Sequence, residues 1–333
     1  MFPINKKKGV SLLRYSLIYP IIRSSNVDFP DRYLHWGSSE DIAEYSKRIS
    51  IEDGFIRSNG LGVNYATPLS LVFDRRGIYF DARVESDLEC YLNNEVLSND
   101  IIERAKLLKS KILNNGITKY NLSSNSVTIP RGHKKVILVP GQVENDMSIK
   151  FGSPIIRKNS DLLIKVRENN PEAFIVYKPH PDVCAKQREG GDEELISKLC
   201  DLIVSESNIL SLFPYIDELH TMTSLSGFEA LIRGIKVYTY GLPFYAGWGL
   251  TIDYVSCPRR KTKRTIDELV ACALILYPVY YHPEKKDKCD VEDAIDWILN
   301  NKNKYETKKF LKKILILVRK TRDIARAKIS QLN

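Results

Sequence analysis

The sequence predicts an α/β protein with two sheet-containing units, followed by C-terminal helices. Short apolar runs alternate with amphipathic helical stretches on both sides of a polar segment at residues 123–135. The 333 residues are 43% hydrophobic, which is enough to bury two sizeable cores. Polar residues follow the expected strands of the second half, where doubly wound sheets gather their ligands.

The first half predicts a parallel strand, helix and strand, then a hairpin and a longer helix. Asp74–Gly77 lies between two short apolar runs and is typical of a hairpin turn. The polar segment at 123–135 contains Pro130 and Gly132 and is expected to end the first domain, residues 1–125. The expected elements are strand 32–37, helix 39–48 with Ser39 as its cap, strands 49–52, 69–73 and 78–80, and helix 100–114.

The second half restarts the alternation of strands and helices and predicts a doubly wound sheet in residues 133–282. Residues 283–333 are then left for C-terminal helices. The expected elements of the second unit are strands 135–139, 174–177, 218–221 and 236–240, and helices 160–169, 193–201, 209–213 and 227–233.

The formal net charge of +9 is concentrated near the C-terminal end. Residues 302–328 contain eleven Lys or Arg against two acidic residues, and their apolar residues recur at near-helical spacing. This pattern is typical of a basic amphipathic helix that lies on an anionic membrane surface. The alternative is a helix packed on its own protein. Nucleic acid is not an expected partner, because the aromatic interleaving of single-strand binders is missing.

The cysteines and the missing motifs narrow the chemistry. Six scattered cysteines, without Cys-X-X-Cys or paired histidines, indicate reduced thiols in a cytoplasmic protein and no zinc site. There is no P-loop, no Gly-X-Gly-X-X-Gly after a strand and no Gly-X-Ser-X-Gly. No Asp-X-Asp is present to hold a metal on a diphosphate. The sequence therefore favours a metal-free site, without a cofactor, for a donor that has one phosphate.

The run from His220 to Leu231 is an expected strand-to-helix turn that suits a phosphate. The first amides of a helix lack intrahelical partners and lie at the positive end of its dipole. Thr223, Ser224 and Ser226 would add hydroxyl donors, and Gly227 would let the backbone approach the ligand. The alternative is an ordinary helix cap, since Ser and Thr are common there.

Two more strand ends provide candidate chemical groups. The loop 141–148 contains the amide of Gln142 and the acid Asp146, which is a candidate nucleophile or base. A helix cap or an Asx turn is the alternative for this aspartate. At residues 178–182, prolines on both sides fix the backbone around His180, next to Lys178, which suggests contact with charge. A structural histidine bonded to a neighbouring carbonyl remains an equal interpretation.

Two stretches near glycines complete the candidates. Glu52 and Asp53 end a strand of the first unit and precede Gly54, which is also typical of turn chemistry. Tyr245 and Trp248 lie among the glycines of residues 241–249. Aromatic rings in such a loop suggest a stacking or carbohydrate-facing surface, with a packed turn as the alternative.

Seven segments of the sequence, in order, resemble the bacterial β-Kdo glycosyltransferases of the KpsC type, a capsule polysaccharide biosynthesis family. The resemblance covers roughly residues 32–283 and is closest to the second of the family's two transferase modules. The motifs are Glu52–Ser58, Pro68–Val72, Gly77–Ala82, Gly141–Asp146, Tyr177–Val183, Thr221–Gly234 and Gly241–Thr251.

The resemblance implies a GT-B-like enzyme with two Rossmann-like domains that face a cleft. It would move Kdo from CMP-β-Kdo to a lipid-linked or oligosaccharide acceptor, with retention and without a metal. The basic helix at 302–328 would hold the enzyme at the inner membrane, where a lipid-linked acceptor is found. Asp146 would be the nucleophile, Glu52 or Asp53 the base toward the acceptor, and Arg57 the residue that orients it. The implied donor-binding residues are Gln142, Lys178, His180, Thr223, Ser224, Ser226, Gly227 and, for the ribose, Glu229.

The chain has one module where the family's capsule enzyme has two, so a partner transferase is one expectation. Two other functions stay open from the residues alone. One is an inverting CMP-sugar transferase on the same fold, which would need a base and no nucleophile. The other is a non-catalytic module that binds a sugar nucleotide or a polysaccharide, which would tolerate the loss of Asp146.

Overall fold

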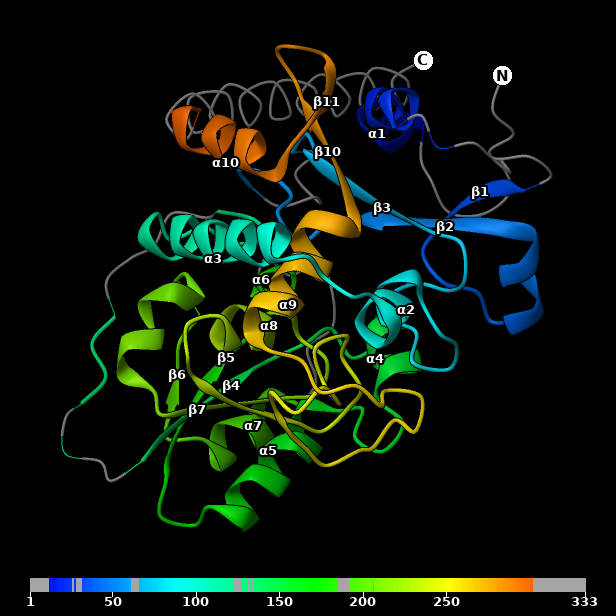
Figure 1. The fold of residues 1–333 in the computed structure, drawn as a ribbon. Helices are drawn as coiled ribbons and strands as arrows, with labels where there is room; N and C mark the ends of the chain where they lie inside the picture. Colours follow the sequence, from blue (N-terminus) through cyan, green and yellow to red (C-terminus); the bar gives the residue numbers. More distant parts are fainter. Residues whose placement is uncertain are drawn as a thin grey trace, which may run out of the picture.

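A computed structural model of the chain describes residues 12–301, except 26, 28–31, 61–65, 122–126, 131, 133–134, 185–191 and 206. The expected basic helix at 302–328 lies outside the described residues. Two sheets, stacked one above the other in Figure 1, organise the described part of the chain, and helices fill the space between them.

The first sheet is mixed, with the strand order β1-β2-β3-β10-β11. Strands β1 and β2 are parallel, as predicted, and the other pairs are antiparallel. A short 3-10 helix, η1 (Ile42–Lys47), joins β1 to β2, and Asp41 caps it in place of the predicted Ser39. The strands are β1 (Tyr33–Trp36), β2 (Arg48–Asp53), β3 (Ser70–Asp74), β10 (Pro278–His282) and β11 (Asp287–Cys289).

The predicted hairpin between residues 69–73 and 78–80 is wrong. Strand β3 pairs with β2 on one side and with β10 on the other, so no neighbour position is left for 78–80. The Asp74 carboxylate accepts hydrogen bonds from the backbone amides of Arg76 (3.0 Å) and Gly77 (2.8 Å). These bonds make an Asx-type turn that directs the chain away from the sheet.

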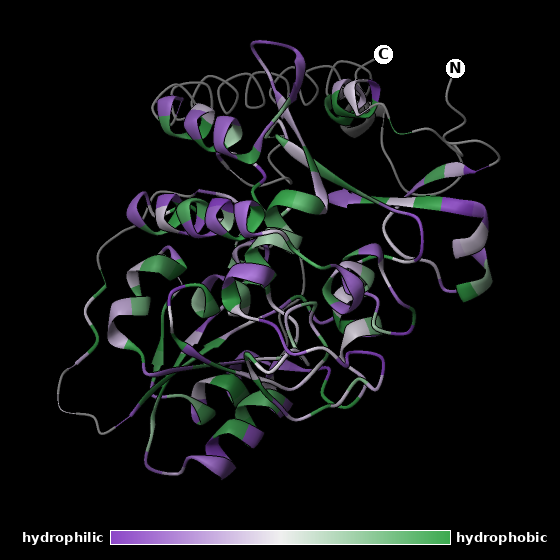
Figure 2. Cartoon of the chain, in the orientation of Figure 1, coloured by the Kyte–Doolittle hydropathy of each residue, from purple (hydrophilic) through white to green (hydrophobic). Residues whose placement is uncertain are grey.

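Helices cover the first sheet from both sides. Helix α1 (Leu12–Ser24) packs Ile18, Ile21 and Ile22 on one face of the sheet. Between the two sheets lie α2 (Asp87–Asn94), α3 (Asn99–Asn114), α9 (Ile266–Val270) and the π-helix η5 (Ala271–Leu276). Figure 2 shows hydrophilic and hydrophobic residues alternating along α3, whose Ala105 and Leu108 are buried in the core. Helix α10 (Val291–Asn300) packs beside β10.

The second sheet confirms the predicted doubly wound unit. Its six strands are all parallel, in the order β6-β5-β4-β7-β8-β9. The strands are β4 (Val136–Pro140), β5 (Phe174–Lys178), β6 (Leu202–Ile203), β7 (Glu218–Thr221), β8 (Lys236–Thr239) and β9 (Ile252–Asp253). The helices are α4 (Met147–Gly152), α5 (Asn159–Asn169), α6 (Pro181–Cys184), α7 (Glu193–Leu199), η3 (Ile209–Ser211), η4 (Phe213–Tyr215) and α8 (Leu225–Leu231).

The chain returns to the first sheet after the second is complete. Strand β10 pairs with β3 through Pro278–Val72 and Tyr280–Ser70 and then turns into β11. The sequence assigned residues up to 282 to the second unit, whereas 278–289 belong to the first sheet. An apolar run shows that a strand is present but carries no information about which sheet it joins.

Candidate active site

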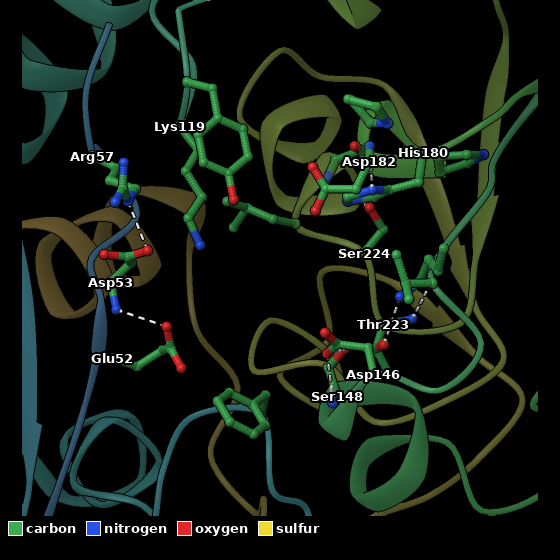
Figure 3. A pocket seen from close by; sticks show the side chains of 18 of the residues that line it. Glu52, Asp53, Arg57, Lys119, Asp146, Ser148, His180, Asp182, Thr223 and Ser224 are labelled. Carbon is green, nitrogen blue, oxygen red and sulfur yellow. Dashed lines mark hydrogen bonds and ion pairs between the residues drawn. The ribbon is translucent and has the colours of Figure 1, made fainter. Parts of the chain in front are cut away.

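A cavity of about 870 Å³ lies between the two units. Its walls come from the carboxyl-terminal ends of strands on both sides: β2 in the first unit, and β4, β5 and β7 in the second. Ligands of open α/β sheets bind at such strand ends. Figure 3 shows Glu52 and Asp53 on one wall and Asp146, Thr223 and Ser224 on the opposite wall.

On the first wall, Asp53 and Arg57 form a buried ion pair. Nε of Arg57 lies 2.7 Å from Oδ2 of Asp53, and the two side chains are 3% and 7% exposed. Arg57 also donates to the Ser58 hydroxyl and to the carbonyl of Ala66, so its guanidinium is held from several sides. Glu52 is less buried, and its carboxylate accepts the backbone amide of Asp53 at 3.0 Å. Asp53 is therefore committed to Arg57, and Glu52 is the more accessible acid.

On the opposite wall, Asp146 is both a helix cap and part of the cavity lining. Its Oδ1 accepts the backbone amide of Ser148 at 2.9 Å and the hydroxyl of the same residue at 2.8 Å, at the start of α4. The sequence left a helix cap and a chemical role as alternatives, and the cap is present. The two bonds also fix the carboxylate at the cavity edge, as a reactive group requires.

Gln142 connects the end of β4 to the turn after β7. Its Oε1 accepts the amide of Thr223 (2.9 Å) and the hydroxyl of Thr221 (3.2 Å), while its Nε2 donates to the Thr223 hydroxyl (2.9 Å). The backbone amide of Gln142 donates to Oδ1 of Asn159, and Nδ2 of Asn159 donates to the backbone carbonyl of Gln142. The amide that the sequence assigned to the ligand is thus engaged in shaping the Thr223 turn.

The turn before α8 presents hydroxyl groups to the cavity. Ser224 caps the helix by accepting the amide of Ser226, and both serines and Thr223 line the cavity. Gly227 does not line it. A Cβ at Gly227 would lie 2.1 Å from the hydroxyl oxygen of Tyr245, so this glycine lets α8 pack closely on the loop 241–249 rather than on a ligand.

The prediction that Tyr245 and Trp248 face a sugar is wrong. Both side chains are fully buried and neither lines the cavity. The Tyr245 hydroxyl donates to the carbonyl of Ser224 (2.5 Å), and Nε1 of Trp248 donates to the carbonyl of Phe244 (2.8 Å). The loop is the packed turn of the alternative interpretation, and it supports the start of α8. Aromatic residues among glycines do not reveal which side of a loop they face.

Lys178 is the last residue of β5 on the second wall, and His180 comes two residues later. Lys178 is 6% exposed, and burial lowers the pKa of its ammonium group. Nδ1 of His180 accepts the backbone amide of Asp182 at 3.1 Å. The neutral imidazole therefore has its proton on Nε2. Both residues line the cavity, where Lys178 supplies a positive charge.

Glu229 and Lys119 meet where the two units join. Oε1 of Glu229 accepts the backbone amide of Lys119 at 3.1 Å, and burial raises the pKa of this carboxyl. The side chain of Lys119 lines the cavity together with Tyr79 and Tyr120. Sequence reasoning missed Lys119 and Tyr120, because the segment at 117–121 follows a helix and carries no motif of its own. It gave Tyr79 no role, although Tyr79 lies in the motif Gly77–Ala82.

Among the residues that the structure describes, no three His, Cys, Asp or Glu side chains are grouped so that they could hold a metal ion. No helix of the described part of the chain is both long and apolar enough to cross a membrane.

Comparison with known proteins identifies the family. The family model described as "Capsule polysaccharide biosynthesis protein" matches residues 41–126 and 99–281. The chain belongs to this family. Among its relatives, the capsule polysaccharide modification protein LipA of Neisseria meningitidis serogroup B is 47% identical over 279 residues, which cover 82% of this chain and 40% of LipA. The chain thus spans about two fifths of that relative's length.

Two solved structures of Thermosulfurimonas dismutans KpsC match nearly the whole fold of this family member. The chain described as a beta Kdo 2,7 transferase is 40% identical with a TM-score of 0.73, and the match covers 88% of this chain and 97% of that one. The beta Kdo 2,4 transferase is 30% identical with a TM-score of 0.76, covering 86% and 96%. The predicted family and the α/β, GT-B-like fold are confirmed. The chain is a member of the capsule polysaccharide biosynthesis protein family and is related to Kdo transferases.

Proposed function

We propose that the chain is a retaining β-Kdo glycosyltransferase that takes Kdo from CMP-β-Kdo and passes it to a hydroxyl of a glycolipid or polysaccharide. The observation that carries this proposal is the cavity between the units, where Asp146 on one wall faces Glu52 on the other. Such an arrangement suits a sugar held between a nucleophile and a base. The similarity to KpsC Kdo transferases supports the same choice of sugar.

The second wall would bind the nucleotide. The donor presents two anions, the phosphate of CMP and the carboxylate of Kdo. Lys178 offers a cation, and Ser224 and Ser226 offer hydroxyl donors at the start of α8. Lys178 would provide the positive charge that a metal provides in other nucleotide-sugar sites, so we propose that neither a metal nor a cofactor is needed.

The reaction would proceed by two displacements. The Asp146 carboxylate attacks the anomeric carbon of Kdo, the bond to the phosphate oxygen breaks and CMP leaves. Glu52 then accepts the proton of the acceptor hydroxyl, whose oxygen attacks the same carbon and releases Asp146. Two inversions restore the original configuration. Glu52 is favoured over Asp53 as the base, because Asp53 is held by Arg57 in a buried ion pair.

The linkage and the setting also belong to the proposal. Sequence identity is higher to the 2,7 transferase than to the 2,4 transferase, which favours a 2,7 linkage. Linkage analysis of the product by NMR tests this assignment.

A lipid-linked acceptor would be met at the inner membrane, where residues 302–328 would hold the enzyme, and a second Kdo transferase would act beside it. Deleting residues 302–328 should release the protein from the membrane fraction in low salt.

Intact-protein mass spectrometry tests the mechanism. Wild type incubated with freshly prepared CMP-β-Kdo should gain the mass of one Kdo residue, and Asp146→Asn should not. Asn keeps an oxygen for the cap of α4, so the variant should fold. Asp182→Asn, at another cavity-lining acid, is the matched control and should still form the adduct. Acceptor-dependent CMP release without an adduct would favour an inverting transferase. Binding without CMP release would favour a non-catalytic module.

A further inference from the structure

Lys119 is fixed by its backbone at the junction of the two units. Its carbonyl accepts the amides of Arg57 (3.1 Å) and Ser58 (3.2 Å) from the first unit. Its own amide donates to Glu229 on α8 of the second unit. Asn121, two residues later, is locked to Thr118 by two reciprocal hydrogen bonds of 3.0 Å. These hydrogen bonds hold the backbone of residues 118–121 in place, so the position of the Lys119 Cα is fixed.

From this place the Lys119 side chain extends into the cavity from the side of the first unit, beside Glu52 and Asp53 (Figure 3). Its ammonium lies 5.6 Å from the centre of the Tyr120 ring. Within the described part of the chain, it makes no ion pair. Burial opposes its charge, but Tyr120, Tyr79 and the two acids together raise the pKa of Lys119 above its ordinary value. The group is thus a cation that faces the cavity.

The other cations of the cavity have different positions. Arg57 is bonded to Asp53, and Lys178 lies at the end of β5, on the side proposed for the nucleotide. Lys119 instead borders the space between Glu52 and Asp146. Under the proposed function, this space holds the transferred sugar, because both acids must act at or next to its anomeric carbon. In Kdo, the carboxylate is attached to that carbon.

We propose that Lys119 binds the carboxylate of the transferred sugar and thereby selects an acidic sugar over a neutral one. This inference rests on the proposed function, which supplies the sugar. The proposed Lys119 contact differs from the nucleotide contacts, because it is made with the sugar and not with CMP. A carboxylate on the acceptor has the same chemistry, and the experiment below separates the two sources.

The experiment compares wild type with Lys119→Met, Lys119→Arg and Lys106→Met. Lys106 is exposed on α3 and paired only with Glu103 in the described part of the chain, so its variant is the matched control. Initial rates of CMP release give KM and kcat for CMP-β-Kdo, KM for the acceptor and the inhibition constant of CMP. We expect Lys119→Met to raise the donor KM about ten- to a hundred-fold, the value of one charge-assisted hydrogen bond. The inhibition constant of CMP should not change, and Lys119→Arg should recover part of the loss.

Each other outcome overturns the proposal. An increase in the acceptor KM alone would assign Lys119 to the acceptor. An equal loss of CMP and donor affinity would indicate a structural role at the Glu229 junction. A fall in kcat alone, with the acid limb of the pH profile moved to higher pH, would show that Lys119 acts by keeping Glu52 ionised. If wild type itself releases no CMP from CMP-β-Kdo, the proposed function fails, which is distinct from a failure at Lys119.

Discussion

Replacing Gly227 by alanine tests the packing that holds the start of α8. The added Cβ would lie 2.1 Å from the hydroxyl oxygen of Tyr245 and 2.7 Å from its Cζ. The Tyr245 ring is fully buried, so it has no open space into which to move. The clash must be relieved by moving either the ring or α8, and either movement breaks the 2.5 Å bond from Tyr245 to the carbonyl of Ser224.

Two terms give the size of the effect. Inserting a methyl group into a well-packed site costs about 1–3 kcal/mol, and losing the hydrogen bond costs about 0.5–1.5 kcal/mol. We therefore expect Gly227→Ala to lower the free energy of unfolding by about 2–4 kcal/mol and the melting temperature by about 3–6 °C. Because the Ser224 carbonyl moves, CMP affinity should fall as well.

Gly234→Ala is the matched control, three residues beyond the end of α8. Gly234 has a positive φ of 78° but nothing within 4 Å of an added Cβ, so the substitution brings backbone strain without a clash. That strain costs about 1–2 kcal/mol, and CMP affinity should not change. Thermal unfolding by circular dichroism and CMP titration measure both variants. A Gly227→Ala protein that melts no lower than Gly234→Ala, with wild-type CMP affinity, would refute the reasoning.

Three more predictions concern charged groups. Burial lowers the pKa of His220 to about 4 in the folded protein, whereas the pKa in the unfolded chain is 6.5. The contribution of the neutral imidazole to the free energy of unfolding is therefore complete above pH 6.5 and is lost as the pH falls toward 4. Urea unfolding should show a loss of up to about 3 kcal/mol over this range, and His220→Gln should not show it. Glu89→Ala should cost about 3–5 kcal/mol in the same assay, since it leaves the buried Arg260 without its carboxylate. The exposed control Glu103→Ala should change nothing measurable, and an equal effect of the two would contradict the argument. Lys178→Met should weaken CMP binding about tenfold or more. It should also raise the melting temperature of the unliganded protein, because burial disfavours the charge of Lys178. A lower melting temperature would show that Lys178 is structural.

The second unit was predictable because its signals are local. Each of its four central strands is short and runs into a polar or glycine-containing turn, and parallel pairing brings these ends to one edge. Asp146, Lys178 and Thr223 were therefore placed together from the sequence, and all three line the cavity.

The features that the sequence could not reveal are set by contacts between distant residues. Strand β10 joins the first sheet through Val72, about two hundred residues away in the chain. Gly227 is required by the Tyr245 ring, and Lys119 faces the cavity because its amide is held by Glu229. No periodicity or motif marks such contacts, since each depends on where the two units meet.

The return of β10 to the first sheet makes the second unit a continuous insertion. Strands β4 to β9 occupy one uninterrupted stretch, whereas the first unit is completed by segments from both sides of it. The second unit could thus be exchanged between relatives as one continuous segment, because the chain enters it from the first unit and returns to the first sheet after it. The first unit, in contrast, is not one continuous segment. A fragment that stops after β9 would leave the edge of β3 without β10, and an uncovered strand edge invites pairing with other chains. Expression boundaries and fusion points should therefore retain β10 and β11.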